Sequence, residues 1–192
     1  MRLTYIYHSG FAIEAPEYTI IIDYYKDSLG EELGVVHDRL LYRTEKLYVL
    51  CTHGHHDHYN PEITKWKEIR SDITYIFSKD IEPVAPKFMG IHFLDKDDVY
   101  KDDLLEIKAY GSTDLGISFK IMDCKQVIFH AGDLNNWHWN EESTPQEIEE
   151  AEKFYEQELN HLASSTSYLD LAIFPVDPRL GKDYMLGAEQ LI

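Results

Sequence analysis

The chain has 192 residues and a formal net charge of −17, because 35 acidic residues outnumber 18 Lys and Arg residues. Hydrophobic residues make up 44% and charged residues 28%, a globular composition that argues against disorder, fibres and coiled coils. Proteins bind nucleic-acid phosphates and anionic membranes mainly through Lys and Arg, which are scarce here. We therefore expect one domain over residues 1–192, with neither a nucleic-acid nor a membrane partner.

The two cysteines, Cys51 and Cys124, are too few for a disulfide framework. Both lie in apolar, strand-like runs, so we predict buried thiols in a reducing compartment. The first residues show no long apolar segment of a secretion signal, and no stretch approaches the roughly 20 apolar residues that span a bilayer. These features predict a cytoplasmic protein.

The first third of the sequence predicts a β-meander. Strand-like runs at 3–7, 11–14 and 18–23 are separated by Ser9-Gly10 and by an Ala-Pro-Glu turn. The polar stretch 27–43, with Gly30 and Gly34, is either a short helix or an excursion near a site. An apolar run at 46–51 predicts a buried strand.

A helix is expected from Pro61 to about Arg70, because Asn60 suits the N-cap and proline suits the first helical position. Further strands are predicted at 73–77, 91–94, 104–110, 116–123 and 126–130. The acidic segment 95–103 is interpreted as a solvated turn.

The last third of the sequence predicts two helices and one strand. A capping box at Thr144 and Glu147 opens a helix to about Leu162, with apolar side chains on one face and glutamates largely on the other. The residues expected on the apolar face are Ile148, Ala151, Phe154, Tyr155, Leu159 and Leu162. A strand at 169–176 and the start of a helix at 183–192 follow. Interleaved strands and helices predict an α/β or layered α+β fold with a mixed sheet.

The main chemical signal is a cluster of histidines. Four of the ten histidines fall within residues 53–58, directly after the predicted strand at 46–51. Neutral imidazole and carboxylate are preferred ligands of zinc and similar ions. A strand end followed by a tight turn at Gly54 can aim several of these side chains at one point. The cluster therefore predicts a metal site; the alternative is an exposed histidine-rich loop.

The segment Thr52-His53-Gly54-His55-His56-Asp57-His58 resembles the His-x-His-x-Asp-His signature of the metallo-β-lactamase fold. The order of elements is similar too, with Gly132-Asp133 after a later strand. The N-terminal hairpin, from His8-Ser9-Gly10-Phe11 to Ile21-Ile22-Asp23, is similar to that of the branch containing ascorbate-6-phosphate lactonases and related hydrolases. The resemblance covers most of the chain and implies an α/β fold, a layered αββα sandwich.

The resemblance implies two metal positions. His53 and His55 would hold the first ion, Asp57 and His58 the second, and Asp133 would bridge both. His56 is the variable residue of the motif and is not expected to be a ligand. One or two divalent ions are implied, zinc first and manganese or iron as alternatives. The ions would activate a water molecule, which Asp57 or Asp133 would orient.

Two departures from the family pattern stand out. The loop that usually supplies a third histidine to the first metal corresponds to residues 109–116, where Asp114 is the only strong ligand type beside Ser112 and Thr113. The family's late histidine has no counterpart either, since no histidine follows His161. We therefore expect the fold to be truncated after Ile192, with its C-terminal helix, strand and late ligand missing or supplied by a neighbouring copy in a homo-oligomer.

Other side chains are candidates for extra ligands or substrate contacts. His130 and His138 could compensate for the missing ligands, and His8, in a hairpin that flanks the cleft in related proteins, could have a role in the site. A tryptophan beside the site could form a wall for an apolar or sugar-like substrate, and a cation near the last strand could hold an anionic group. These candidates are His8, His130, His138, Trp137 with its neighbour Trp139, and Arg179 with Lys182.

Together these features predict a metal-dependent hydrolase that acts on a small ester, lactone or phosphodiester. The alternative is a catalytically weak or inactive protein of the same fold, which binds metal or ligand or serves as an assembly subunit. This alternative rests on the absence of two histidines that serve as metal ligands in the family. Nucleic-acid processing, a third possibility, conflicts with the charge of −17.

Overall fold

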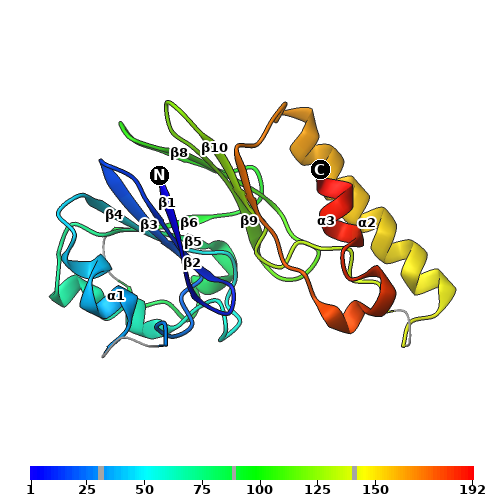
Figure 1. Ribbon diagram of the computed structural model, residues 1–192, viewed down its shortest axis with the longest axis horizontal. Helices are drawn as coiled ribbons and strands as arrows, with labels where there is room; N and C mark the ends of the chain where they lie inside the picture. Colours follow the sequence, from blue (N-terminus) through cyan, green and yellow to red (C-terminus); the bar gives the residue numbers. More distant parts are fainter. Residues whose placement is uncertain (30–32, 88–89, 140–141) are drawn as a thin grey trace. The chain divides into compact units, whose positions relative to one another are not determined.

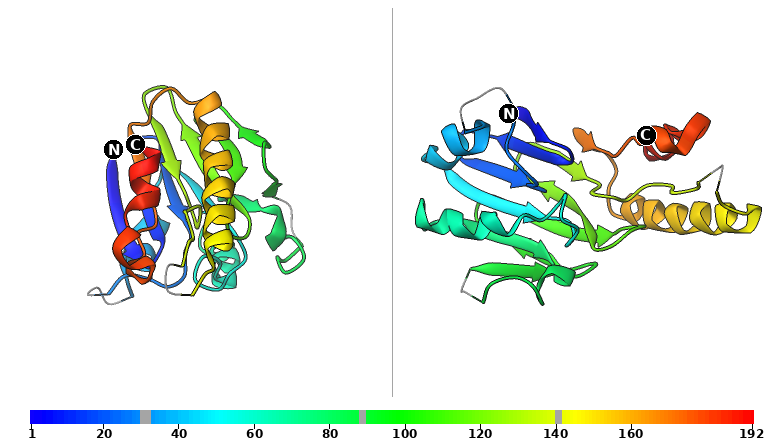
Figure 2. Two further views of the ribbon diagram at one scale, coloured as in Figure 1. Left: turned by 90° about the vertical axis from the view of Figure 1, so that its right-hand side faces the viewer. Right: turned by 90° about the horizontal axis from the view of Figure 1, so that it is seen from below.

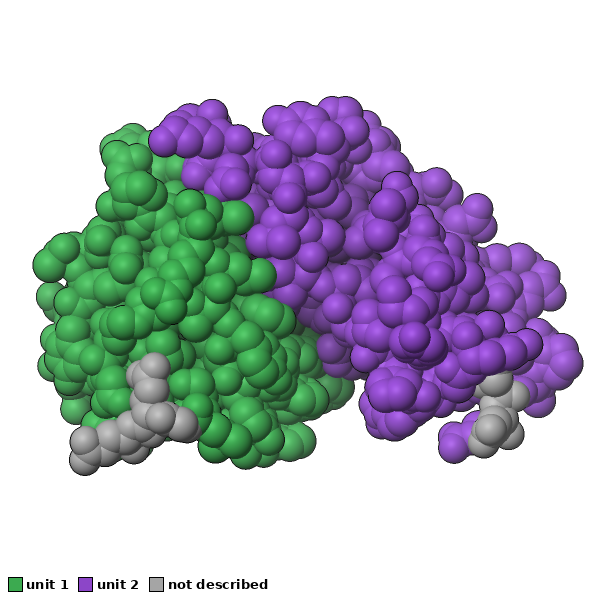
Figure 3. Space-filling model, viewed as in Figure 1, with its two compact units in different colours: residues 1–95, 102–104 green, residues 96–101, 105–192 purple. Residues whose placement is uncertain are grey.

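The computed structural model describes residues 1–29, 33–87, 90–139 and 142–192. The chain divides into two compact units, each built on one β-sheet (Figures 1 and 3). Unit 1 comprises residues 1–95 and 102–104, and unit 2 comprises residues 96–101 and 105–192. The predicted α/β class is confirmed. That residues 1–192 form a single domain stays a prediction.

Unit 1 contains a six-stranded sheet in the order β1-β2-β3-β4-β5-β6. The first three strands are antiparallel, and β3 to β6 run parallel. Every residue of β3 and β5 is buried, as expected for the central strands of a parallel sheet. The strands are β1 (Arg2–Tyr7), β2 (Gly10–Glu14), β3 (Tyr18–Ile22), β4 (Lys46–Cys51), β5 (Thr74–Ser78) and β6 (Ile91–Leu94), all close to their predicted positions.

The helical segments of unit 1 are short. They are α1 (Val35–Asp38) and three 3₁₀ segments, η1 (Leu40–Tyr42), η2 (Pro61–Glu68) and η3 (Lys79–Ile81). The predicted helix after Asn60 is therefore present and capped by that residue, but it has 3₁₀ geometry and ends at Glu68. Its buried residues, Ile63 and Trp66, are three positions apart, the spacing that a 3₁₀ helix places on one face.

The polar stretch 27–43 contains α1, so the short-helix alternative is confirmed there; Gly30 lies outside the described residues. Asp27 positions α1, because its carboxylate accepts hydrogen bonds from the backbone N–H groups of Val36 and His37 at 3.0 and 2.9 Å. The core of unit 1 includes Trp66, whose ring meets Tyr24 edge-on at a centroid distance of 4.8 Å.

Unit 2 contains a five-stranded sheet in the order β11-β10-β9-β8-β7, in which only β10 and β11 are parallel. The expectation of a solvated turn over 95–103 is wrong in part, because residues 99–101 form a strand that pairs with β8. The predicted strand at 169–176 is shorter than expected. The strands are β7 (Val99–Lys101), β8 (Glu106–Gly111), β9 (Ile117–Met122), β10 (Val127–His130) and β11 (Leu171–Ile173).

Two helices of unit 2, α2 (Pro145–Ser164) and α3 (Leu186–Leu191), lie side by side (Figure 2), and the hydroxyl of Tyr155 on α2 donates to the carbonyl of Gly187 on α3 at 2.6 Å. A 3₁₀ segment, η4 (Pro178–Asp183), precedes α3. The predicted capping box at Thr144 is confirmed. No helix among the described residues is both long enough and apolar enough to cross a membrane.

The face assignment of α2 needs two corrections. Phe154, expected on the apolar face, is 45% exposed. Glu158, a glutamate, is buried instead, because Lys96 Nζ lies 2.7 Å from its carboxylate and the backbone of Gly111 packs against it. An ion pair with a partly exposed lysine thus accompanies the burial of one glutamate of this helix.

The two cysteines differ from each other. Cys51 is buried at the end of β4, and burial raises the pKa of its thiol, as do the negative charges of Asp23 and Asp80. Cys124 is exposed, so the prediction of a buried thiol is wrong there. Its apolar run ends at Met122, and Cys124 lies in the turn that connects β9 to β10.

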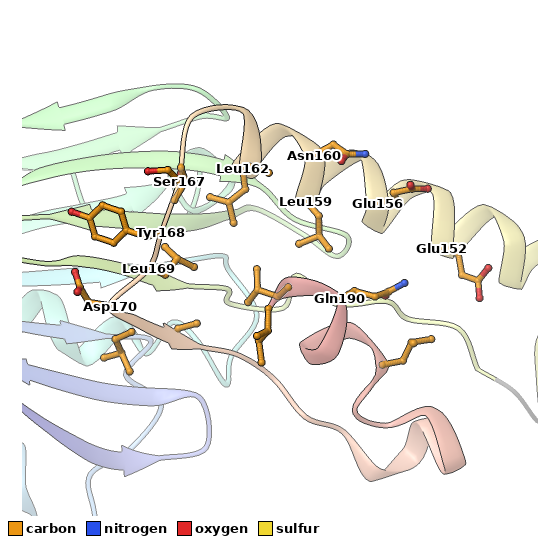
Figure 4. Close-up of a pocket in the computed structure, with 17 residues that line it drawn as sticks. Glu152, Glu156, Leu159, Asn160, Leu162, Ser167, Tyr168, Leu169, Asp170 and Gln190 are labelled. Carbon is orange, nitrogen blue, oxygen red and sulfur yellow. The ribbon is translucent and has the colours of Figure 1, made fainter.

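A groove of about 950 Å³ lies between α2, α3 and the segment around β11 (Figure 4). Its apolar lining includes Leu159, Leu162 and Leu169, and Glu152 and Glu156 line it farther along α2. The described residues that line this groove include none of the predicted metal ligands.

Candidate metal centre

The topology of unit 1 gathers polar residues at one edge of its sheet. Strands β3 and β4 are parallel, and β1 runs in the same sense as β3 because both are antiparallel to β2. The residues that follow these three strands therefore share the carboxyl edge, where open α/β sheets bind ligands. They are His8 after β1, Asp23 after β3, and the histidine-rich segment 52–58 after β4.

Asp23 is the organising residue of this edge. Its side chain is fully buried, and it accepts three hydrogen bonds: from the Thr52 N–H and hydroxyl at 2.8 Å each, and from His58 Nδ1 at 2.9 Å. Its φ of 50° is left-handed, a conformation that aspartate tolerates better than most residues. Sequence reasoning noted Asp23 only as the end of a hairpin. The available signal was a carboxylate directly after a strand that ends in three isoleucines.

The contact with Asp23 determines which nitrogen of His58 can bind a metal. Because a carboxylate only accepts hydrogen bonds, we assign the proton to Nδ1, and the ligand role then falls to Nε2. Such carboxylate–histidine pairs orient metal ligands in many proteins. The ring centres of His58 and His53 are 4.0 Å apart, and those of His53 and His55 are 4.7 Å apart.

Two groups of possible ligand atoms arise in unit 1. His53 and His55 offer nitrogens within 4.8 Å of each other, and His8, Asp57 and His58 offer ligand atoms that all lie within the same distance of one another. His56 points to solvent, with 84% of its side chain exposed, as expected for the variable residue of the motif.

The electrostatics keep Asp57 ionised. Burial alone would raise the pKa of its carboxyl, but its own backbone N–H and the charges of His58, His8 and His56 outweigh burial and lower the pKa. An ionised carboxylate is the form that binds a metal or accepts a hydrogen bond from water.

Unit 2 gathers carboxylates by the same topological rule. Strands β8 and β10 run in the same sense because each is antiparallel to β9, so the residues that follow them share one edge. Asp114 follows β8, Asp133 follows β10, and their carboxylate oxygens lie within 4.8 Å of each other. Thr113 joins the two loops that carry these aspartates. Its hydroxyl donates a hydrogen bond to the Asn135 carbonyl at 2.6 Å and accepts one from the Asn135 backbone N–H at 3.0 Å.

An aromatic platform follows Asp133 in unit 2. The indole N–H of Trp137 donates to the Asp133 carbonyl at 2.7 Å, and the rings of Trp137 and Trp139 stack at a centroid distance of 5.7 Å. The guanidinium of Arg179 lies 5.3 Å from the centre of the Trp139 ring and is ion-paired with Asp177. The predicted wall and cation are thus brought together, although their contact with substrate stays a prediction.

His130 and His138 are both buried in unit 2. Nδ1 of His130 accepts a hydrogen bond from the Gly132 N–H at 3.1 Å, and Nδ1 of His138 lies 3.1 Å from the Asn136 carbonyl oxygen. These local contacts give each imidazole a structural role in its own turn. A ligand role for either residue stays a prediction.

The donors in unit 1 fit a divalent metal. They are imidazoles and a carboxylate, the ligand types that zinc, iron and manganese accept, and one imidazole is fixed by a buried carboxylate behind it.

The family described as "Beta-lactamase superfamily domain" matches residues 2–150. Among solved structures, the chain is similar to Igni18, a metallo hydrolase from the archaeon Ignicoccus hospitalis, with 20% identity, a TM-score of 0.53, and coverage of 68% of this chain and 59% of that one. It is also similar to CmlA, a diiron β-hydroxylase from Streptomyces venezuelae, with 16% identity, a TM-score of 0.59, and coverage of 88% and 33%.

The Rm3 metallo-β-lactamase is a third similar structure, with 14% identity, a TM-score of 0.55, and coverage of 95% of this chain and 85% of that one. No curated protein matches the sequence. The finer resemblance to the ascorbate-6-phosphate lactonase branch stays a prediction. Because the family match covers well over half of the chain, the chain belongs to the beta-lactamase superfamily and has the metallo-β-lactamase fold.

Proposed function

We propose that this chain is a metal-dependent hydrolase that uses a metal-activated water to cleave a small ester, lactone or phosphodiester. The observation that carries the proposal is the buried Asp23–His58 pair. A carboxylate held at 0% exposure behind a signature histidine serves little purpose in an exposed loop, but it orients a metal ligand. The alternative of an exposed histidine-rich loop does not explain this pair.

The proposed roles of the ligands are those that the family resemblance implies. In this proposal His53 and His55 hold one ion, Asp57 and His58 hold another, and Asp133 is shared. Asp114 takes the place of the family's third histidine, which is supported by its closeness to Asp133 within unit 2. Zinc is the first expectation for this donor set, with manganese and iron as the other candidates.

The protein's own residues then prepare the reaction. When bound, the divalent ion would lower the pKa of water towards about 7 and polarise the scissile bond. Asp23 keeps His58 in one tautomer, so that the ligand geometry is fixed before substrate arrives. Asp57, whose pKa is lowered, accepts a hydrogen bond from the attacking water and orients it.

The aromatic platform supports a small ring-containing substrate. Stacked Trp137 and Trp139 offer a flat apolar wall, and Arg179 adds a cation that suits an anionic group. We further propose a cytoplasmic protein that acts on small molecules, either alone or as a homo-oligomer. The charge of −17 supports the exclusion of nucleic acid as a substrate.

The test is a hydrolysis panel with defined metal content. The protein is stripped with a chelator, reloaded with Zn²⁺, Mn²⁺ or Fe²⁺, and assayed on lactones, nitrophenyl esters and bis(nitrophenyl) phosphate. We expect turnover of at least one class, lost on chelation and in His55→Ala, but retained in the control His56→Ala. Stoichiometric metal without turnover on any class would favour the binding-protein alternative. Absence of bound metal together with absence of turnover would refute the proposal.

A further inference from the structure

His8 occupies an unusual place in unit 1. It lies in the turn between β1 and β2 with a left-handed φ of 53°, which is uncommon for a residue other than glycine. Gly10 allows this turn to approach the carboxyl edge, because a Cβ on Gly10 would lie 2.9 Å from the Tyr7 carbonyl and 3.0 Å from that of Asp23. The hairpin thus delivers an imidazole to the edge that carries the signature.

The side chain of His8 meets the second half of the signature. Its Nε2 lies 3.1 Å from Asp57 Oδ2, and its ring centre lies 6.0 Å from that of His58. Ligand atoms of His8, Asp57 and His58 all lie within 4.8 Å of one another. Two ligands about 2.1 Å from a zinc ion in tetrahedral geometry are roughly 3.4 Å apart, so the His8–Asp57 distance suits a shared ion.

A surface ion pair is the simpler explanation of this contact. However, the side chains of His8 and Asp57 are 50% and 31% exposed, and ion pairs that are exposed to solvent contribute little to stability. The pair alone therefore does not offset the strain of holding a residue other than glycine in left-handed backbone. A His8–Asp57 ion pair also does not explain why His58, which Asp23 orients, lies beside both residues.

We propose that His8 is a further protein ligand of the metal position held by Asp57 and His58, in addition to the shared Asp133. This inference rests on the proposed function, because it names the ligand that completes one of its metal positions.

The test compares His8→Gly with His56→Ala. Glycine adopts a φ of 53° without strain, so His8→Gly removes the imidazole while leaving the turn relaxed. His56 is the matched control, since its Nδ1 also lies near Asp57, 3.8 Å from Oδ1. Zn²⁺ affinity is measured on the full chain by competition with a chromophoric chelator, and Co²⁺ absorption reports the ligand number.

We expect His8→Gly to bind one Zn²⁺ equivalent at least about 10-fold more weakly than the unsubstituted protein, with added imidazole restoring affinity, while His56→Ala is unchanged. Thermal unfolding of the metal-free proteins checks the fold, and His8→Asn, which also tolerates this backbone, repeats the test if His8→Gly is unstable. Equal Zn²⁺ affinity in all variants would overturn the role of His8 but leave metal-dependent hydrolysis intact. An unsubstituted protein that binds no Zn²⁺, Mn²⁺ or Fe²⁺ and hydrolyses nothing would overturn both proposals.

Discussion

The two units hold their candidate ligands in different ways. In unit 1, the signature histidines follow a buried parallel strand, and Asp23 fixes His58 from behind with no exposure to solvent. In unit 2, Asp114 and Asp133 lie on loops that are joined by Thr113 and Asn135. Buried hydrogen bonds preorganise the signature residues of unit 1, whereas contacts between loops position the two aspartates of unit 2. We therefore expect residues behind the ligands to matter most in unit 1, and the ligands themselves to matter most in unit 2.

The largest effect is expected from Asp133→Asn. The proposed function assigns Asp133 to both metal positions, so removing its charge should reduce kcat/KM on the best panel substrate by about 1000-fold, or roughly 4 kcal/mol of transition-state stabilisation. Asp114→Asn, which affects one position, should cost about 10- to 100-fold. Steady-state kinetics at matched metal content measures both. Equal losses in the two variants would contradict the distinct roles given to these carboxylates.

Asp23→Asn tests the preorganisation of unit 1. Asparagine matches aspartate in size and tolerates a φ of 50°, but its amide cannot accept all three hydrogen bonds that Asp23 receives. His58 then loses the partner that fixes its tautomer. Metal affinity should fall about 10- to 100-fold, as for other residues that orient a ligand. Chelator competition measures the affinity, and an unchanged affinity would show that Asp23 serves folding alone.

Glu14 on β2 provides the contrasting buried carboxylate of unit 1. It accepts hydrogen bonds from Thr4 at 2.9 Å, from Arg39 at 3.0 Å and from Arg43 at 3.1 Å, and it is not among the candidate ligands. Glu14→Gln should therefore destabilise the protein by about 1.5 kcal/mol without changing metal affinity. Thermal unfolding and chelator competition separate the two effects. If Glu14→Gln lowered metal affinity, metal binding at the carboxyl edge of unit 1 would depend on the packing of the whole unit and not on the ligands and Asp23 alone.

The destabilisation caused by Glu14→Gln should depend on pH. Burial alone would raise the pKa of Glu14, but hydrogen bonds from Arg39 and Thr4, together with the charges of Arg39 and Arg43, outweigh burial and lower the pKa below its ordinary value of 4.5. A lowered folded-state pKa stabilises the protein above the unfolded pKa, and this stabilisation is lost as pH falls through the folded value. The melting temperatures of the unsubstituted protein and Glu14→Gln should thus differ most near pH 7 and converge as the pH falls below 4.5 and through the lowered folded-state pKa of Glu14.

The elements of the fold were largely predictable because their signals are local. Apolar runs between turn residues located β1 to β6, and the capping box located α2. The failures have tertiary causes. Residues 99–101 are a strand because β8 offers them a partner, and Glu158 is buried because Lys96 reaches it from outside the helix. Charge patterns alone cannot reveal either contact.

The candidate site was only partly predictable for the same reason. The signature residues are contiguous in sequence, so their clustering could be inferred from residues 53–58 alone. Asp23 and His8 join them only because β1, β3 and β4 run in the same sense and end at one edge. That strand order is a tertiary property, and no spacing in the sequence reports it. The closeness of Asp114 and Asp133 has the same origin in the order of β8, β9 and β10.

The smallest effect is expected from Arg179→Ala, which tests whether the platform of unit 2 binds substrate. Arg179 is exposed, lies over Trp139 and shares its charge with Asp177, so the net attraction left for an anionic substrate is modest. KM should rise about fivefold with kcat unchanged, the pattern of uniform binding. Lys182→Ala, also exposed and nearby in sequence, is the control. A neutral substrate should show no change in either variant, because only an anion gains from the guanidinium. If kcat falls instead, Arg179 acts in the transition state, and unit 2 contributes more than positioning to the chemistry.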